Sequence, residues 1–185
     1  MTTKEKLVTY DDYRKLPDDG KRYEIIRGEL LMTPAPSTNH QRVLGKLFIS
    51  LNNYVEENNL GEVLVAPVDI IFSMTDVVQP DLIFVSRERE EIITKKNIVD
   101  APDLVVEIIS EHTEAIDRNR KKALYERYKV REYWIVDPEE RQIMQYVFEE
   151  GAFKLQANTR TEDAGKIISA AVTDFTLRLK DVFKN

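Results

Sequence analysis

Hydrophobic residues recur every three or four positions in two long segments, a spacing typical of helices that bury one face. The first segment follows the capping residues Ser37–Asn39 and ends near Asn58–Gly61. The second runs from about 114 to 129. Thr9 with Asp12 also forms a capping pattern, which predicts a short helix ending near Leu16.

Segments rich in apolar and β-branched residues alternate with turn residues and predict strands. Residues 22–32 predict a β-hairpin with its tight turn at Arg27–Gly28. Arg87–Glu91 is expected to form a helical turn or a loop. The other predicted strands span about 62–66, 68–73, 81–85, 103–109, 132–136, 142–148 and 152–157.

The segment 103–109 is almost continuously apolar, which is typical of a central strand buried on both faces. The strand–helix–strand order across 103–136 predicts a parallel crossover, and the remaining connections favour antiparallel pairing. We therefore expect an α/β protein of the mixed α+β type, with a central mixed β-sheet flanked by helices. The length of 185 residues suits a single domain over 1–185, with its core at about 9–183.

The composition excludes several classes of site and location. Cysteine is absent, which excludes disulfides, thiolate zinc sites and a cysteine nucleophile. No apolar run approaches the roughly 20 residues of a membrane helix, and no secretory signal is visible, so we expect a cytoplasmic protein with no membrane partner.

The net charge of −6 argues against tight non-specific binding of nucleic acid, which usually needs a basic excess. The stretch 118–131 is nevertheless locally basic and could meet phosphates. A solvated helix face explains this stretch at least as well.

Two carboxylates stand in otherwise apolar strands. Glu107 interrupts the central strand, where an unpaired buried charge is costly, and Asp81 follows Pro80 at the start of another strand. The alternatives are a strand-end position or an ion pair for Glu107 and ordinary turn chemistry for Asp81. Because neighbouring strands lie about 4.8 Å apart, the two carboxylates could share one hard cation.

Other polar residues are candidates for the same site. Glu24 lies within the first hairpin strand, and Asp69 is a similar but weaker candidate; both could simply face solvent. Lys121 shares a helix face with Asp117, Leu124, Tyr125 and Tyr128 and lies within reach of the end of the Glu107 strand. An ordinary (i, i+4) ion pair with Asp117 is the alternative role of Lys121. His40 could approach the site or only bond at the helix start.

The order Pro80-Asp81 and then Glu107 resembles the PD-(D/E)XK nuclease superfamily, although the lysine expected two residues after the glutamate is Ile109 here. The wider pattern resembles the Uma-two family of restriction-endonuclease-like proteins over roughly residues 9 to 183. The matching segments are Tyr23–Leu30, His40, Gln79–Leu82, Pro102–Ser110, Asp117–Lys121 and Glu132–Pro138.

This resemblance implies a restriction-endonuclease-like fold and hydrolysis of phosphodiester bonds in nucleic acid, with DNA favoured over RNA. It implies Asp81, Glu107 and the main-chain carbonyl of Ile108 as ligands of Mg²⁺ or Mn²⁺. Lys121 would replace the missing strand lysine and would orient water or stabilise the phosphate. Glu24 would be an additional acidic residue that binds a second metal or accepts a proton. Ser110 lies beside the site and is assigned no chemistry.

A catalytically silent module that keeps the nuclease fold for dimerisation or partner binding is the alternative function. Ile109 in place of the usual lysine and the acidic net charge favour it. A homodimer is compatible with this alternative function. Aromatic residues could serve an interface, although a core position is expected for several of them: Tyr133, Trp134, Tyr146 and Phe148.

Overall fold

The structure is a computed structural model that describes residues 7–17, 19–110, 113–163 and 165–183. The helical segments are α1 (Tyr10–Tyr13), α2 (Thr38–Glu57), η1 (Arg87–Ile92), η2 (Ile116–Lys121), α3 (Lys122–Arg127), η3 (Thr161–Asp163) and α4 (Leu179–Val182). The strands are β1 (Arg22–Ile26), β2 (Glu29–Thr33), β3 (Gly61–Val65), β4 (Ile70–Ser73), β5 (Asp76–Val78), β6 (Leu82–Ser86), β7 (Leu104–Ile108), β8 (Glu132–Asp137), β9 (Gln142–Glu149), β10 (Ala152–Arg160), β11 (Lys166–Ile168) and β12 (Thr176–Arg178).

A six-stranded sheet in the order β10-β9-β8-β7-β6-β3 forms the centre of the molecule. Its β7–β8 pair is parallel and is connected through η2 and α3, whereas the other pairs are antiparallel. The expected mixed sheet with flanking helices and a parallel crossover is therefore confirmed. All five residues of β7 are buried, as the continuous apolar run predicted.

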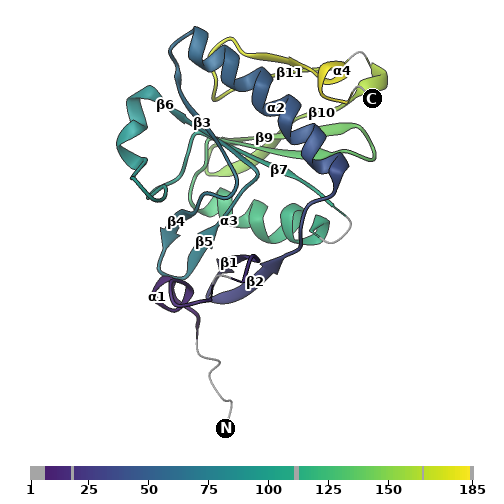
Figure 1. The fold of residues 1–185 in the computed structure, drawn as a ribbon. Coiled ribbons are helices and arrows are strands. Elements are labelled where there is room, and N and C mark those ends of the chain that lie inside the picture. Colours follow the sequence, from purple (N-terminus) through teal and green to yellow (C-terminus); the bar gives the residue numbers. More distant parts are fainter. Residues whose placement is uncertain (1–6, 18, 111–112, 164, 184–185) are drawn as a thin grey trace.

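Alternate residues of the central strands pack into two separate cores. Leu104, Val106 and Ile108 face α2 and the C-terminal segment, which cover one side of the sheet (Figure 1). Val105 and Ile109 face the opposite side, where α3 and a second sheet lie. By this alternation Glu107 belongs to the side of α3.

The second sheet has four strands in the order β2-β1-β5-β4. It contains the predicted hairpin, whose turn places Arg27 and Gly28 at positive φ. The predicted strand 68–73 begins only at Ile70, and β5 has just three residues, too few for an alternating pattern to show in the sequence. The same shortness explains why β11, β12 and α4 were not predicted.

The helix predicted over 114–129 consists of two parts. Its first part, η2, is a π-helix, and α3 continues it to Arg127. A π-helix closes its hydrogen bonds over five residues, which a period of 3.6 does not predict, and such segments are frequent at functional sites. None of the helices in the described ranges is long and apolar enough to cross a membrane.

A fully buried carboxylate joins β8 to the C-terminal segment on the α2 side of the sheet. Glu132 is 0% exposed. It forms no ion pair among the described residues. Its two oxygens instead accept hydrogen bonds from Trp134 Nε1, Gln145 Nε2, Ser169 Oγ, Ala170 N and Ala171 N, at 2.5–3.0 Å. Five donors thus replace the water that this carboxylate loses on folding.

We predict that Glu132→Gln lowers the free energy of unfolding by about 3 kcal/mol. The new side-chain NH₂ group would face hydrogen-bond donors in the place of a carboxylate oxygen that accepted from them. Urea denaturation measures the change. Glu88→Gln, on an exposed residue of η1, is the matched control and should have little effect. A loss below about 1 kcal/mol for Glu132→Gln would show that the network adds little stability.

Candidate functional site

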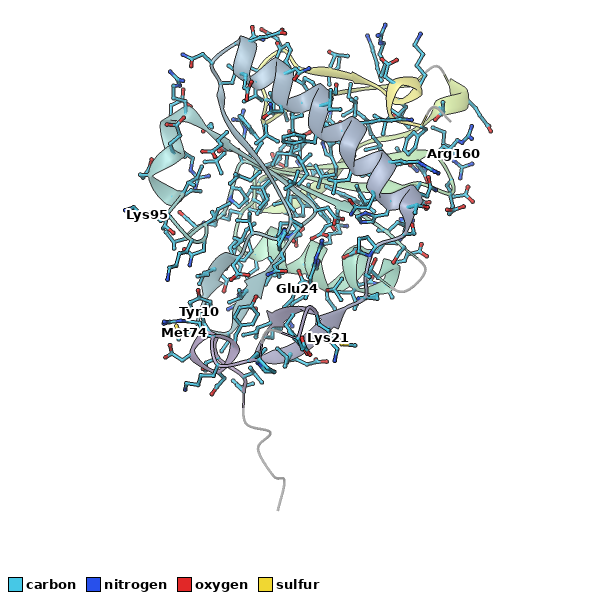
Figure 2. The ribbon with its side chains drawn as sticks, viewed as in Figure 1. Tyr10, Lys21, Glu24, Met74, Lys95 and Arg160 are labelled. Carbon is cyan, nitrogen blue, oxygen red and sulfur yellow. The ribbon has the colours of Figure 1, made fainter. Side chains whose placement is uncertain are left out.

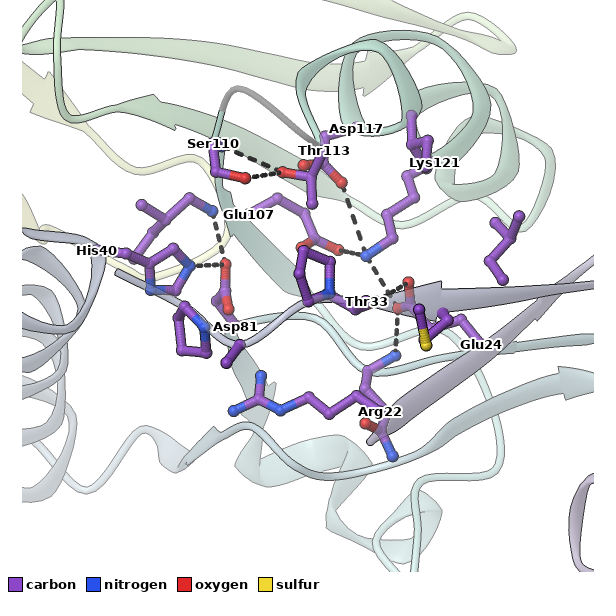
Figure 3. Close-up of a pocket in the computed structure, with 18 of the residues that line it drawn as sticks. Arg22, Glu24, Thr33, His40, Asp81, Glu107, Ser110, Thr113, Asp117 and Lys121 are labelled. Atoms are coloured by element: carbon purple, nitrogen blue, oxygen red, sulfur yellow. Dashed lines mark hydrogen bonds and ion pairs between the residues drawn. The ribbon is translucent and has the colours of Figure 1, made fainter. Parts of the chain in front are cut away.

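A cavity of about 300 Å³ lies where the central sheet, the β1–β2 hairpin, the start of α2 and η2 meet (Figure 3). The four residues expected to act in the chemistry all line this cavity, namely Glu24, Asp81, Glu107 and Lys121. The residues that carry charge in its lining are Arg22, Glu24, Asp81, Glu107, Asp117 and Lys121.

Asp81 and Glu107 reach the cavity through the pairing of β6 with β7. Leu82 pairs with Val106 in this antiparallel ladder, so the next step of the register sets Asp81 opposite Glu107. Opposed residues project from the same face of a sheet. Both residues are buried, with 7% of Asp81 and 3% of Glu107 exposed.

Hydrogen bonds hold one oxygen of each carboxylate. Asp81 Oδ2 accepts from the Ile108 main-chain N–H at 2.8 Å and lies 3.0 Å from His40 Nε2. Glu107 Oε1 accepts from Lys121 Nζ at 3.0 Å and from the Tyr125 hydroxyl at 2.6 Å. Asp81 Oδ1 and Glu107 Oε2 form no such bond within the described part of the chain.

Lys121 comes from the crossover helix, as predicted, and its ammonium group lies among three carboxylates. Nζ is 2.9 Å from Glu24 Oε1, 3.0 Å from Glu107 Oε1 and 3.7 Å from Asp117 Oδ1. Glu24 is held further by the Gln79 main-chain N–H, which donates to Oε1 at 2.7 Å. Glu24 lies in the interior, beneath the crossover helix (Figure 2).

The carboxylates outnumber the cations in this cavity. Burial raises the pKa of Glu107 well above its ordinary range; Lys121 opposes the rise, and Asp117, Asp81 and Glu24 add to it. Burial also raises the pKa of Asp117 to about 6 against the opposing effect of Lys121. Burial acts to lower the pKa of Lys121, but Glu107, Glu24 and Asp117 raise it well above its ordinary range, so Lys121 stays charged. The cavity thus favours further positive charge.

The side chains present fit a partly hydrated divalent cation. No three His, Asp or Glu side chains in the described ranges come close enough to enclose a metal by themselves. Mg²⁺, however, takes only one or two carboxylates and keeps several waters. Asp81 Oδ1 and Glu107 Oε2 supply two hard oxygens, and Ile108 also lines the cavity.

Two buried atoms of residues that line the cavity support this fit. His40 Nδ1, on the ring that contacts Asp81, and Gln79 Oε1 have no hydrogen-bond partner in the described residues. If His40 Nε2–H donates to the Asp81 carboxylate, Nδ1 is an acceptor, as is the Gln79 oxygen. Unpaired acceptors suit the waters of a hydrated cation.

The other residues considered from the sequence have different surroundings. Asp69 is not part of the lining; its Oδ1 accepts from the Tyr13 hydroxyl at 2.9 Å and from Gln79 Nε2 at 2.8 Å. Ser110 lies in the lining and hydrogen-bonds with Thr113. Tyr133 and Trp134 are buried in the core, so they are unavailable to a partner, whereas Tyr146 and Phe148 are half-buried.

Much of the basic stretch 118–131 is engaged within the molecule. Arg118 pairs with Glu114 and Asp137, and Arg120 pairs with Glu29. The Lys122 ammonium lies 4.2 Å from the centre of the Tyr146 ring, and Arg127 approaches Asp76 at 3.6 Å. These contacts favour a structural role for the stretch over a free face for phosphates.

Sequence reasoning gave no site role to several residues that the structure brings there. His40 has both of its two expected roles, because its main-chain N–H donates to the capping Ser37 Oγ at the start of α2 while its ring contacts Asp81. Tyr125 stood on the predicted face of Lys121, and Gln79 stood in the Gln79–Leu82 segment, but neither was assigned a contact. For Arg22 the sequence pattern predicts only the start of a strand.

Comparison with known proteins identifies the family. A family model described as "Putative restriction endonuclease" matches residues 10–180. The chain belongs to this family, Uma2. The site residues Glu24, Asp81, Glu107 and Lys121 all lie within the matched range.

A solved structure has a similar fold. The chain is similar to a crystal structure described as that of "a putative nuclease belonging to DUF820" from Anabaena variabilis. The TM-score is 0.79 at 19% identity, over 95% of this chain and 97% of that one. At this identity the likeness shows the fold. No match was found among curated proteins.

We predict that Asp117→Asn stabilises the metal-free protein at pH 8. Because the pKa of Asp117 is raised in the folded protein, its charged form disfavours folding. The free energy of unfolding therefore falls as pH rises from 3.8, the pKa in the unfolded chain, through about 6. The variant should gain about 1–3 kcal/mol at pH 8 and converge with the wild type near pH 4.

Denaturant unfolding at both pH values measures this gain. Glu114→Gln, one turn earlier on an exposed position, is the matched control. A variant less stable than the wild type at pH 8 would contradict an acidic excess in the cavity.

Proposed function

We propose that this protein is a divalent-metal-dependent nuclease that hydrolyses phosphodiester bonds in nucleic acid. The observation that carries the proposal is the meeting of Asp81, Glu107, Glu24 and Lys121 in one cavity, from four separate segments of the chain. The family description and the nuclease-described structural neighbour support a nuclease-like function. The description as a restriction endonuclease favours DNA over RNA as the substrate.

In this proposal Asp81 Oδ1, Glu107 Oε2 and the Ile108 carbonyl hold Mg²⁺ or Mn²⁺. When bound, the cation supplies charge neutralisation for the phosphate and activation of a water molecule. The chain keeps both ligands oriented, because the Ile108 N–H and His40 hold Asp81 while Lys121 and Tyr125 hold Glu107. Such second contacts orient a metal ligand before the metal arrives.

Lys121 acts as a positive point charge beside the reacting groups. Its ammonium carries three protons, which can donate to a water or to a phosphate oxygen as negative charge develops there. Glu24 holds Lys121 through Oε1, while Oε2 accepts only a 3.5 Å contact from the Thr33 hydroxyl. Glu24 Oε2 is therefore the oxygen that accepts a proton from the attacking water in this scheme.

We expect Mn²⁺ binding, measured by calorimetry, to be lost or weakened at least about 100-fold in Asp81→Asn and in Glu107→Gln, because each removes a charged ligand. Cleavage of plasmid DNA should fall in parallel. Asp69→Asn is the matched control: it neutralises a half-buried acid directly before β4 that does not line the cavity. It should bind Mn²⁺ like the wild type.

Lys121→Met separates chemistry from metal binding in the same experiment. It should still bind Mn²⁺, within about tenfold of the wild type because Tyr125 continues to hold Glu107, and cleave at least about 100-fold more slowly. Lys122→Met makes the same change on the next residue and should cleave normally. Cleavage that survives in both ligand variants would contradict the nuclease proposal, and absence of Mn²⁺ binding and of cleavage in the wild type would favour the silent module.

A further inference from the structure

Arg22 is a second cationic residue of the cavity and has no role in the hydrolysis proposed for this site. It is the first residue of β1, pairs with Thr33 of β2, and is half-buried. It stands two residues before Glu24, so strand alternation points both side chains to the same face. The Arg22 side chain extends toward the Asp81 side of the cavity (Figure 3).

The guanidinium group of Arg22 forms no hydrogen bond or ion pair with any residue in the described ranges. In this it differs from Lys121, whose ammonium is surrounded by Glu24, Glu107 and Asp117. It also differs from Arg118 and Arg120 of the basic stretch, which are paired with acids. Arg22 is therefore the cation of the cavity lining that is left available to a ligand.

A phosphate that enters this cavity meets four carboxylates, namely Glu24, Asp81, Glu107 and Asp117. A bound divalent cation offsets part of this charge, but Lys121 faces carboxylates on three sides. An arginine is suited to the remaining task, because its planar fork of N–H groups binds two phosphate oxygens at once and stays charged at every relevant pH.

We propose that Arg22 is the phosphate-binding residue of the cavity and that its guanidinium group binds the non-bridging oxygens of a phosphodiester in the nucleic-acid strand. This assignment rests on the proposed nuclease function and adds to it the residue that recognises the substrate. Arg22 acts in binding, whereas Asp81, Glu107 and Lys121 act in the chemistry. Its loss should therefore weaken substrate binding without weakening the metal site.

The test measures binding of a fluorescein-labelled short DNA duplex by anisotropy, with Ca²⁺ present as a hard divalent cation. Arg22→Gln should weaken binding by about 10- to 100-fold, as expected for loss of a charge-assisted hydrogen-bond pair. Arg22→Lys keeps the charge without the fork and should give an affinity between those of the wild type and Arg22→Gln. The slope of log affinity against log salt should fall by about one in Arg22→Gln.

Lys21→Gln is the matched control, because it removes one positive charge at the preceding residue. Lys21 is exposed, pairs with Asp19 at 3.2 Å, and lies on the outer side of the hairpin (Figure 2). It should bind the duplex within about twofold of the wild type, since an exposed ion pair contributes little. The thermal unfolding temperature establishes that each variant is folded. An Mn²⁺ affinity no weaker than that of the wild type establishes that its metal site is intact.

Equal duplex binding by Arg22→Gln and Lys21→Gln would overturn the proposal, as would a wild type that does not bind the duplex in Ca²⁺. Failure of the nuclease function gives a different result. In that case duplex binding would still depend on Arg22, while no Mn²⁺-dependent cleavage would occur, and Arg22 would stand as the anchor of a nucleic-acid-binding module.

Discussion

The ammonium group of Lys121 is the interaction on which the geometry of the cavity depends. It bridges Glu24 from the β1–β2 hairpin and Glu107 from the central strand, and it lies near Asp117 one turn back on its own helix. Three structural units that belong to different sheets or layers are thus joined by one buried cation. Removing the one cation from such a buried set usually costs several kcal/mol, because the remaining carboxylates lose their compensation.

This arrangement places negative charge where folding alone would avoid it. The central sheet supplies rigidity, since every residue of β7 is buried and its hydrogen bonds run to β6 and β8. The polar cavity lies at the end of these strands, beside the π-helix that carries Asp117 and Lys121. Natural proteins keep such locally unfavourable groups mainly at functional sites, where a ligand supplies the missing interaction.

The sequence was sufficient for the parts governed by local pattern. The apolar period of α2, the buried run of β7 and the crossover order are local or nearly local properties, and they predicted the central sheet. Glu107 and Asp81 stood out because a carboxylate in an apolar strand needs a partner. The helix face shared by Asp117 and Lys121 followed from helical geometry, and both side chains are buried on that face.

The remaining features depend on tertiary contacts that no local pattern encodes. The separation of β1, β2, β4 and β5 into a second sheet depends on the three-residue strand β5. The contact of His40 with Asp81 joins residues 41 positions apart, and the availability of Arg22 depends on which acids lie near it. Glu132 is another case, because its donors come from β8, from β9 and from the C-terminal segment.

Anomalous diffraction from crystals soaked in Mn²⁺ shows directly whether Asp81 and Glu107 bind a metal. We expect one strong peak in the cavity, within bonding distance of Asp81 Oδ1, Glu107 Oε2 and the Ile108 carbonyl, with Lys121 Nζ beside it. A saturating soak that leaves this position without a peak, or that places the manganese away from Asp81 and Glu107, would contradict the proposed metal site.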